Sequence, residues 1–385
     1  MTNEIITVNH RAVEERNLFS DNLVERFIKF VDVKPKSAST YITALKQLFK
    51  FLAANGVAQP IRADIENWRD ALKTGAIDKN GVIHSDGEVT PDGKIYRRKV
   101  VAQVVKFYLV DTNGKEVSLA KSPATVQLYI NATRLFFGWL SQEGLYPNIT
   151  NHFKTGVKVG TAHKKDPLDA AQAGLLIKNV GAKTYKTKRG KDRKVNTLKI
   201  KRDRAILALL ACSALRTIEV IRLDKGDMYD SYGKTYVKVQ GKGHDAKDSD
   251  VLIPTQVKAL IDEYIAERGN IADTDPLFTS TANSNRGSRL TTQTISKMVK
   301  ANLRANGLDS PRLTAHSLRR SAITIMLLNG VALTDVQQCA RHSNLNTTQI
   351  YNDAVKRLKN TAEQTAANSI FATIRPVGGE KGVAV

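Results

Sequence analysis

The chain of 385 residues is poor in cysteine and in acidic side chains, and it contains no long apolar run. Its two cysteines, Cys212 and Cys339, lie far apart in apolar segments. This argues against a disulfide framework or a cysteine-based zinc site and favours a reducing cytoplasm. No stretch reaches the roughly 18 apolar residues that a membrane span requires. Lys and Arg outnumber Asp and Glu by 59 to 37, so the net charge of +22 favours a polyanionic partner, nucleic acid before an anionic membrane.

Helical periodicity dominates the first 150 residues. Hydrophobic residues make up 42% of the chain, which excludes wholesale disorder, and the length predicts two or three domains. Four stretches have apolar side chains at helical spacing, and their predicted starts are Ser20, Ser39, Asp64 and Ser122. Three of these stretches end at a glycine, namely Gly56, Gly75 and Gly144. We therefore predict an N-terminal segment over residues 1–17 and a helical domain over 18–150.

Residues 78–120 interrupt this helical pattern. They contain four turn dipeptides that favour positive φ, namely Asn80-Gly81, Asp86-Gly87, Asp92-Gly93 and Asn113-Gly114. Between the last two lies a run, Ile95 to Val110, that is rich in Val, Tyr and Phe. We interpret residues 78–120 as a β-rich insertion, and a flexible excursion with one hairpin is the alternative.

Positive charge is concentrated after a linker that we expect over residues 151–165. Residues 183–204 carry 11 basic side chains against two acidic ones, and we predict that they form a basic insertion in the second domain. Most such runs are solvated loops, but here we favour a strap that grips a phosphate backbone. The candidate DNA contacts in this strap are Lys183, Lys186, Lys188, Arg189, Lys191, Arg193 and Lys194.

From Arg204 onward the sequence becomes apolar and helical. Two short β-like runs, 235–240 and 251–254, flank the segment Gly241-Lys242-Gly243. Further helical patterns cover residues 255–268, 291–305, 317–329, 333–341 and 346–368. We predict a mostly helical domain with one small sheet over 166–375, followed by a tail over 376–385.

Seven residues in this second domain carry ionisable side chains in ordered contexts: Arg216, Glu219, Lys242, His316, Arg319, His342 and Tyr351. Taken singly, each has an ordinary explanation. Arg216 and Glu219, one turn apart in a helix that we predict over 206–223, would form a buried ion pair, and Tyr351 would pack in the core. Together they offer cations, two imidazoles and a phenol without a cluster of metal-binding carboxylates. That set fits metal-free phosphoryl transfer, in which cations stabilise the phosphate oxygens and Tyr351 is the nucleophile.

These residues and their spacing resemble the tyrosine recombinases (phage integrase family). The segment Ala214–Glu219 is similar to the family's first arginine box, Gly241–Gly243 to its hairpin lysine, and His316–Arg319 to its His-x-x-Arg box. The run from His342 to Tyr351 has the family's His-to-Tyr spacing. Order, spacing and predicted elements agree across residues 165–360.

The chain also departs from the family's pattern. The family usually has Leu-Gly before the late histidine, where this sequence has Ala340-Arg341. We predict that Arg341 contacts DNA, as does Arg320. The insertions at 78–120 and 183–204 are not common in the family.

The resemblance implies a mainly α fold, in which a helical core-type DNA-binding domain precedes a mostly helical catalytic domain with a small antiparallel sheet. This is the DNA breaking-rejoining enzyme fold, and its two domains would grip a duplex from opposite faces. It also implies that no cofactor is needed, neither ATP nor a metal, because a phosphotyrosine conserves the energy of the broken bond.

The resemblance further implies a role for each reactive residue. Tyr351 would attack the scissile phosphate to give a 3′-phosphotyrosine and a free 5′-hydroxyl, with His316 as the general base. Arg216 and Arg319 would hold the non-bridging oxygens. Lys242 would protonate the leaving oxygen, and His342 would donate a hydrogen bond to the phosphate. Glu219 would orient Arg216.

Strand exchange in this family implies a homotetramer on two duplexes, a Holliday junction, and a last helix near 368–374 that docks on a neighbouring protomer. The partner would be a double-stranded DNA recombination site, and integration or excision of a mobile element the biological role. The need for an accessory DNA-bending factor stays open. Two alternatives are a type IB topoisomerase, which shares the chemistry, and a non-catalytic DNA-binding relative.

Overall fold

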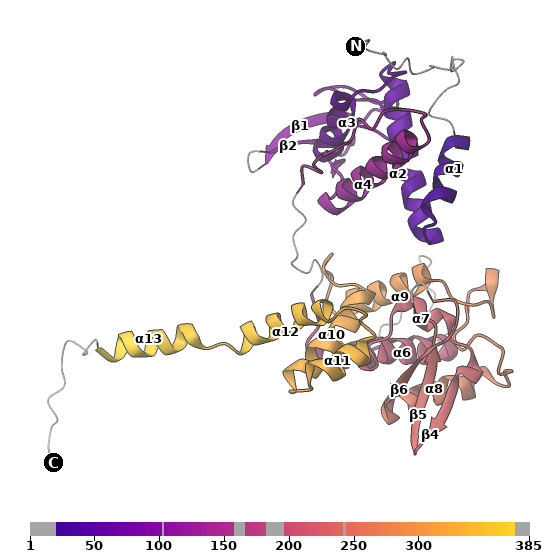
Figure 1. Ribbon diagram of the computed structural model, residues 1–385. Coiled ribbons are helices and arrows are strands. Elements are labelled where there is room, and N and C mark those ends of the chain that lie inside the picture. Colours follow the sequence, from indigo (N-terminus) through magenta and orange to yellow (C-terminus); the bar gives the residue numbers. More distant parts are fainter. Residues whose placement is uncertain (1–20, 102–103, 158–165, 182–195, 242–243, 374–385) are drawn as a thin grey trace, which may run out of the picture. The chain divides into compact units, whose positions relative to one another are not determined.

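The computed structural model describes residues 21–101, 104–157, 166–181, 196–241 and 244–373. The chain forms two compact units, an N-terminal unit over residues 1–162 and a C-terminal unit over 163–385 (Figure 1). Among the described residues, helices predominate in both units, and each unit has one three-stranded antiparallel sheet. The mainly helical fold class predicted from the sequence is therefore confirmed.

Four helices surround the core of the N-terminal unit: α1 (Asp21–Val31), α2 (Pro35–Ala54), α3 (Arg62–Thr74) and α4 (Pro123–Gln142). Their inward faces bury aromatic and aliphatic side chains, among them Phe27, Leu48, Trp68 and Phe136. Such a core accounts for most of the stability of an amphipathic bundle, since burial of each large apolar side chain contributes about 1.5–3 kcal/mol.

The starts of two of these helices differ from the prediction: α3 begins at Arg62, before the predicted Asp64, and α2 also begins early. Ser122 caps α4 as predicted, because its hydroxyl accepts a hydrogen bond from the Thr125 N–H at 3.2 Å. Helix α2 begins at Pro35, earlier than the predicted Ser39. Proline has the φ of a helical residue and needs no N–H in the first turn, so Pro35 itself opens the helix.

Between α3 and α4, three strands form an antiparallel meander: β1 (Ile95–Val101), β2 (Val104–Val110) and β3 (Glu116–Ser118). One face of this sheet buries Tyr96 and Phe107. The glycines of the four predicted turn dipeptides all have positive φ, between 75° and 89°. Glycine tolerates this left-handed region without a steric penalty, which is why these dipeptides mark the turns.

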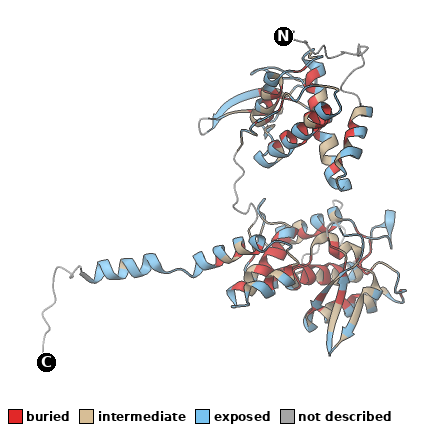
Figure 2. Cartoon of the chain, in the orientation of Figure 1, coloured by how far each residue is buried: buried red, intermediate tan, exposed pale blue. Residues whose placement is uncertain are grey.

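Two largely buried helices, α6 (Thr197–Cys212) and α10 (Ala315–Leu328), form the centre of the C-terminal unit (Figure 2). Helices α5 (Ala170–Lys178) and α8 (Thr255–Arg268) pack on α6, and α11 (Leu333–Ala340) and α12 (Leu345–Lys359) pack on α10. Helix α7 (Thr217–Arg222) packs on α9 (Thr292–Ala305), and the last described helix is α13 (Ala362–Thr373). The sheet is a meander of β4 (Met228–Ser231), β5 (Lys234–Val239) and β6 (Ser249–Ile253), of which β4 was not predicted.

The continuous helix predicted over 206–223 is wrong. Helix α6 ends at Cys212, and α7 begins at Thr217 with Arg216 as its N-cap residue. The helix is interrupted at Ala214, which has a left-handed φ of 47°. Because neither glycine nor proline marks this position, nothing in the local sequence indicated the break.

Two other boundaries differ from the prediction. Residues 196–204 of the expected strap form the N-cap and first turns of α6, where Arg202 and Asp203 are a buried ion pair. Lys183, Lys186, Lys188, Arg189, Lys191, Arg193 and Lys194 lie outside the described residues. The helix expected over 346–368 is divided at Asn360, whose extended backbone separates α12 from α13.

Across the described parts of the chain, every helix is too short or too polar to cross a membrane.

Candidate active site

Glu219 anchors Arg216 at the start of α7. The backbone N–H of Arg216 donates to Glu219 Oε2 at 2.7 Å, and its Nη1 donates to Oε1 at 2.8 Å. One carboxylate therefore fixes both the backbone and the side chain of Arg216. The carboxylate is fully buried and accepts a third bond, from Arg341 Nη2 at 2.7 Å. Burial alone would raise the pKa of Glu219, but the charge of Arg341 and these hydrogen bonds outweigh it and lower that pKa.

Arg319 reaches the same cluster from α10 and is only 2% exposed. Its Nη1 donates to the carbonyl of Ala214, and its Nη2 donates to the carbonyl of Ala340. Burial lowers the pKa of Arg319 to about 9, with a further contribution from Arg216 that Glu219 opposes. The guanidinium therefore stays protonated at neutral pH.

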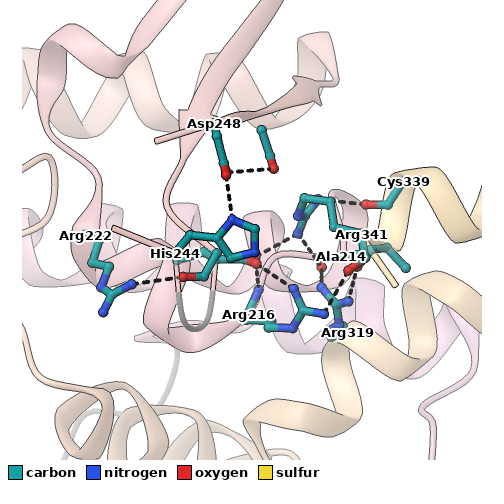
Figure 3. Close-up of polar contacts among 12 residues, drawn as sticks. Ala214, Arg216, Arg222, His244, Asp248, Arg319, Cys339 and Arg341 are labelled. Carbon is teal, nitrogen blue, oxygen red and sulfur yellow. Dashed lines mark hydrogen bonds and ion pairs between the residues drawn. The ribbon is translucent and has the colours of Figure 1, made fainter. Parts of the chain in front are cut away.

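The loops after α6 and α11 hold the guanidinium groups together (Figure 3). Arg216 Nη2 donates to the carbonyl of Arg341 at 3.1 Å, beside the Ala340 carbonyl that Arg319 uses. Arg341 caps α11 in the left-handed conformation, with φ of 52°. Its side chain is 12% exposed and also donates to the carbonyls of Cys339 and Ala214. Arg341, predicted from the sequence as a DNA contact, is therefore a member of the arginine cluster and is hydrogen-bonded within the protein.

His342 follows directly after α11 and faces Tyr351. The two rings stack with their centroids 6.2 Å apart, and His342 Nδ1 lies 2.9 Å from the hydroxyl of Thr348. Burial, followed by the charges of the neighbouring arginines, lowers the pKa of His342 to about 4. The imidazole is therefore neutral at physiological pH and can donate only one N–H.

Tyr351 lies in α12 and is 4% exposed, within an apolar cluster formed by α10, α11 and α12. Burial raises the pKa of its phenol, and the charges of Arg320, Arg319 and Arg216 oppose that rise. The guanidinium carbon of Arg320 is 5.3 Å from the centroid of the Tyr351 ring. Arg320, predicted as a DNA contact, is only 6% exposed, so the structure places it inside the unit against this tyrosine.

His316 and Lys242 are the two other residues predicted for the site. His316 is exposed on α10, one turn before Arg319, and its charge contributes to the lowered pKa of His342. Lys242 lies outside the described residues. The residue before it is held in place, because Arg222 Nη1 donates to the Gly241 carbonyl at 3.1 Å.

Sequence reasoning missed several supporting contacts. Arg341 donates to Glu219, and His342 contacts Thr348. Neither contact follows from the spacing of the predicted motifs. One signal was available, since Arg341 stands where the resembled family has glycine. A non-glycine residue at a left-handed position must be kept there by its side-chain contacts.

The assembled site is cationic. Arg216, Glu219, Arg319, His342 and Tyr351 come together from the α6–α7 junction, α10, the loop after α11 and α12. Within the described ranges, no group of three His, Cys, Asp or Glu side chains could hold a metal ion. Clustered guanidinium groups with one neutral imidazole and a phenol suit the binding of an anion such as a phosphodiester.

Comparison with known proteins agrees with this chemistry. Residues 187–357 match the model of the phage integrase family. The tyrosine recombinase XerC of Corynebacterium efficiens is 30% identical over 241 residues, which cover 62% of this chain and 70% of that protein. The tyrosine recombinase XerD of Lacticaseibacillus casei is 31% identical over 247 residues, which cover 64% and 77%.

Solved structures share the fold. The XerH site-specific recombinase bound to palindromic difH substrate aligns with a TM-score of 0.59 and 18% identity, over 91% of this chain and 84% of that one. A lambda integrase dimer bound to a COC′ core site aligns with a TM-score of 0.55 and 15% identity, over 86% and 76%. With the sequence matches, these findings show that the chain belongs to the tyrosine recombinases of the phage integrase family and is a tyrosine-type site-specific recombinase.

Proposed function

We propose that this recombinase cleaves each DNA strand by attack of the Tyr351 phenolic oxygen on the scissile phosphate, giving a 3′-phosphotyrosine and a free 5′-hydroxyl. The observation that carries the proposal is the position of Tyr351, which stacks on His342 beside the buried Arg319 and Arg320. A phosphodiester drawn to those cations would meet this phenol. Tyr351 also has the spacing to His342 that the family's nucleophile has.

Arg216 and Arg319 would bind the non-bridging oxygens of the phosphate. Both are cations held by backbone carbonyls, so their geometry is set before substrate binds. Loss of one such donor typically slows a reaction by about 10²–10³-fold. Glu219 would act as the positioning residue for Arg216.

Two residues would transfer protons, and a third would hydrogen-bond the phosphate. His316 would accept the proton of Tyr351, and Lys242 would donate one to the leaving 5′-oxygen. His342, neutral because its pKa is about 4, would hydrogen-bond a phosphate oxygen without adding charge. Its Nδ1 already faces Thr348, which leaves Nε2 as the atom for the phosphate.

The DNA partner would be a double-stranded recombination site, gripped in part by the basic residues between Lys183 and Lys194. Domain boundaries near those predicted are supported by the division of the chain between residues 162 and 163, within the expected linker at 151–165. Strand exchange would use a homotetramer on two duplexes and a Holliday junction, to integrate or excise a mobile element. Exposed apolar side chains near the C-terminus, Leu358 at 72% and Phe371 at 68%, support docking of α13 on a neighbouring protomer.

The experiment uses a nicked duplex carrying the recombination site, on which cleavage releases a short strand and traps the covalent adduct. Wild-type protein should give an adduct that survives boiling in detergent, and Tyr351→Phe should give none while binding the duplex equally well. If Tyr351→Phe still forms the adduct, Tyr351 is not the nucleophile. Incubation with a supercoiled plasmid that lacks the site controls for topoisomerase activity, which would relax the plasmid.

A further inference from the structure

Arg320 is a buried arginine whose role is not accounted for by the proposed phosphate contacts. It follows Arg319 in α10 and is 6% exposed. Among the described residues, its Nε and Nη1 have no hydrogen-bond partner. A buried guanidinium with unpaired N–H groups is costly, and an apolar side chain would fill the same space more cheaply. Packing alone therefore does not explain an arginine here.

The contact that Arg320 does make is with Tyr351. Its guanidinium carbon lies 5.3 Å from the ring centroid, within the range of a cation–π interaction. A cation at this position stabilises a phenolate more than a phenol, because the phenolate carries a full negative charge. Among the groups that oppose the effect of burial on the pKa of Tyr351, Arg320 ranks first.

Two other charged groups and one neutral imidazole face the same tyrosine. Arg319 acts from α10 and Arg216 from the start of α7, while His342 stacks on the ring from the loop after α11 and is neutral. Both Arg319 and Arg216 are bonded to backbone carbonyls and would be partly neutralised by a bound phosphate. Arg320 would keep its full effect on Tyr351 once DNA is bound.

The groups that face Arg320 itself do not neutralise it. Asp166 and Arg312 both act on its pKa, in opposite directions. These two side chains form an ion pair with each other, with Arg312 Nε 2.6 Å from Asp166 Oδ2. The carboxylate that acts on Arg320 is therefore already paired with Arg312.

We infer that Arg320 is a positioning residue that holds the Tyr351 ring and stabilises its phenolate, and that it thereby sets the pH range in which this recombinase cleaves and rejoins DNA. The inference rests on the proposed function, since it takes Tyr351 as the nucleophile. It replaces the DNA contact predicted for Arg320 from the sequence.

Stabilisation of the Tyr351 phenolate matters both for cleavage and for rejoining. In cleavage the bond between Tyr351 Oη and phosphorus forms and the bond from phosphorus to O5′ breaks. The phenolic proton passes to the base, and a proton is delivered to O5′, so no net proton is consumed. In rejoining the 5′-hydroxyl attacks and the phenolate leaves. A group that stabilises the phenolate therefore speeds both steps.

The experiment compares Arg320→Met and Arg320→Lys with wild type in the full-length chain, measuring single-turnover adduct formation on the nicked duplex from pH 6 to pH 10. If loss of the cation raises the pKa of Tyr351 by one unit, the rate at pH 7 falls about tenfold, since the phenolate fraction falls tenfold. The Arg320→Met deficit should shrink as the pH rises, and Arg320→Lys should recover most of the rate. Arg304→Met, which removes an exposed arginine from α9, is the matched control and should match wild type throughout.

A second readout keeps the test independent of packing defects. Replacement of Tyr351 by a fluorotyrosine of lower pKa should restore adduct formation by Arg320→Met at pH 7, because ionisation no longer depends on Arg320. A deficit that is equal at every pH and unaffected by fluorotyrosine would reduce Arg320 to a structural role. Weaker binding with an unchanged rate in the bound complex would restore it as a DNA contact.

Failure of this inference can be told apart from failure of the proposed function. If Tyr351→Phe forms the adduct, the nucleophile itself is misassigned. If Tyr351→Phe is inactive but Arg320→Met shows the wild-type pH profile, only the role of Arg320 is overturned.

Discussion

Replacing Glu219 with glutamine should destabilise the C-terminal unit of this recombinase while leaving the N-terminal unit unchanged. The carboxylate is fully buried and accepts three hydrogen bonds, two from Arg216 and one from Arg341. Glutamine keeps the shape but removes the negative charge, so the guanidinium groups of the cluster repel one another without a counter-ion. Breaking a buried ion pair on one side costs about 3–5 kcal/mol, and we expect about 2–4 kcal/mol here because Arg216 is 29% exposed.

The two units can be followed separately in one urea titration. Both tryptophans of the chain, Trp68 and Trp139, lie in the N-terminal unit, so tryptophan fluorescence reports on that unit and circular dichroism on both. Glu219→Gln should move the dichroism transition to lower urea and leave the fluorescence transition in place. The matched control is Glu363→Gln, which removes an exposed ion pair with Arg357 and should change neither.

The effect should also depend on pH with a definite sign. Glu219 has a folded-state pKa below the usual 4.5, so its charge stabilises the fold above pH 4.5. That stabilisation is lost as the pH falls through the folded-state pKa. The difference between wild type and Glu219→Gln should therefore be complete at pH 7 and shrink below about pH 4. A loss under about 1 kcal/mol at pH 7, or an equal loss at pH 3, would refute the reasoning.

Three further outcomes are expected. His342, with a pKa of about 4, should stay neutral in an NMR titration down to about pH 5. Since the usual pKa of histidine is 6.5, wild type should lose stability as the pH falls from 6.5 to 4, and His342→Gln should lack this loss. Replacing Lys188, Arg189 and Lys191 with glutamine should weaken binding to every duplex alike, and the salt dependence of the affinity should fall by about 0.9 for each lost phosphate contact. Arg341→Gly should slow single-turnover cleavage about tenfold with little change in affinity, because one hydrogen bond that positions Glu219 and hence Arg216 is lost.

The helices were largely predictable because their signals are local. The predicted range 255–268 coincides with α8, and the Ser122-Pro123 start of α4 follows from the chemistry of a helix N-terminus. The break at Ala214 was not predictable, because alanine has no preference for the left-handed region. Contacts with distant residues determine its conformation.

The candidate site was predictable as a set of residues but not as a network. Arg216, Arg319, His342 and Tyr351 lie together in the structure, although their roles stay a prediction. Because a basic side chain at a helix start or end is most often solvated, the position of Arg320 could not be inferred, and for Arg341 the one signal was that the family has glycine there. Only tertiary packing turns these two inward.

The turns at Ala214 and Arg341 orient the arginine side chains of the site, and those side chains in turn stabilise the turns. Ala214 and Arg341 both have positive φ, which costs a non-glycine residue about 1–2 kcal/mol relative to the right-handed conformation. Their carbonyl groups accept hydrogen bonds from Arg319 and Arg216, and a bond to a charged donor contributes about 1.5–3 kcal/mol. Each strained turn therefore persists because a guanidinium stabilises it, and each guanidinium is oriented by the turn. Since neither bond involves a substrate atom, the cations are arranged before DNA binds, and the reorganisation they would otherwise require is completed during folding.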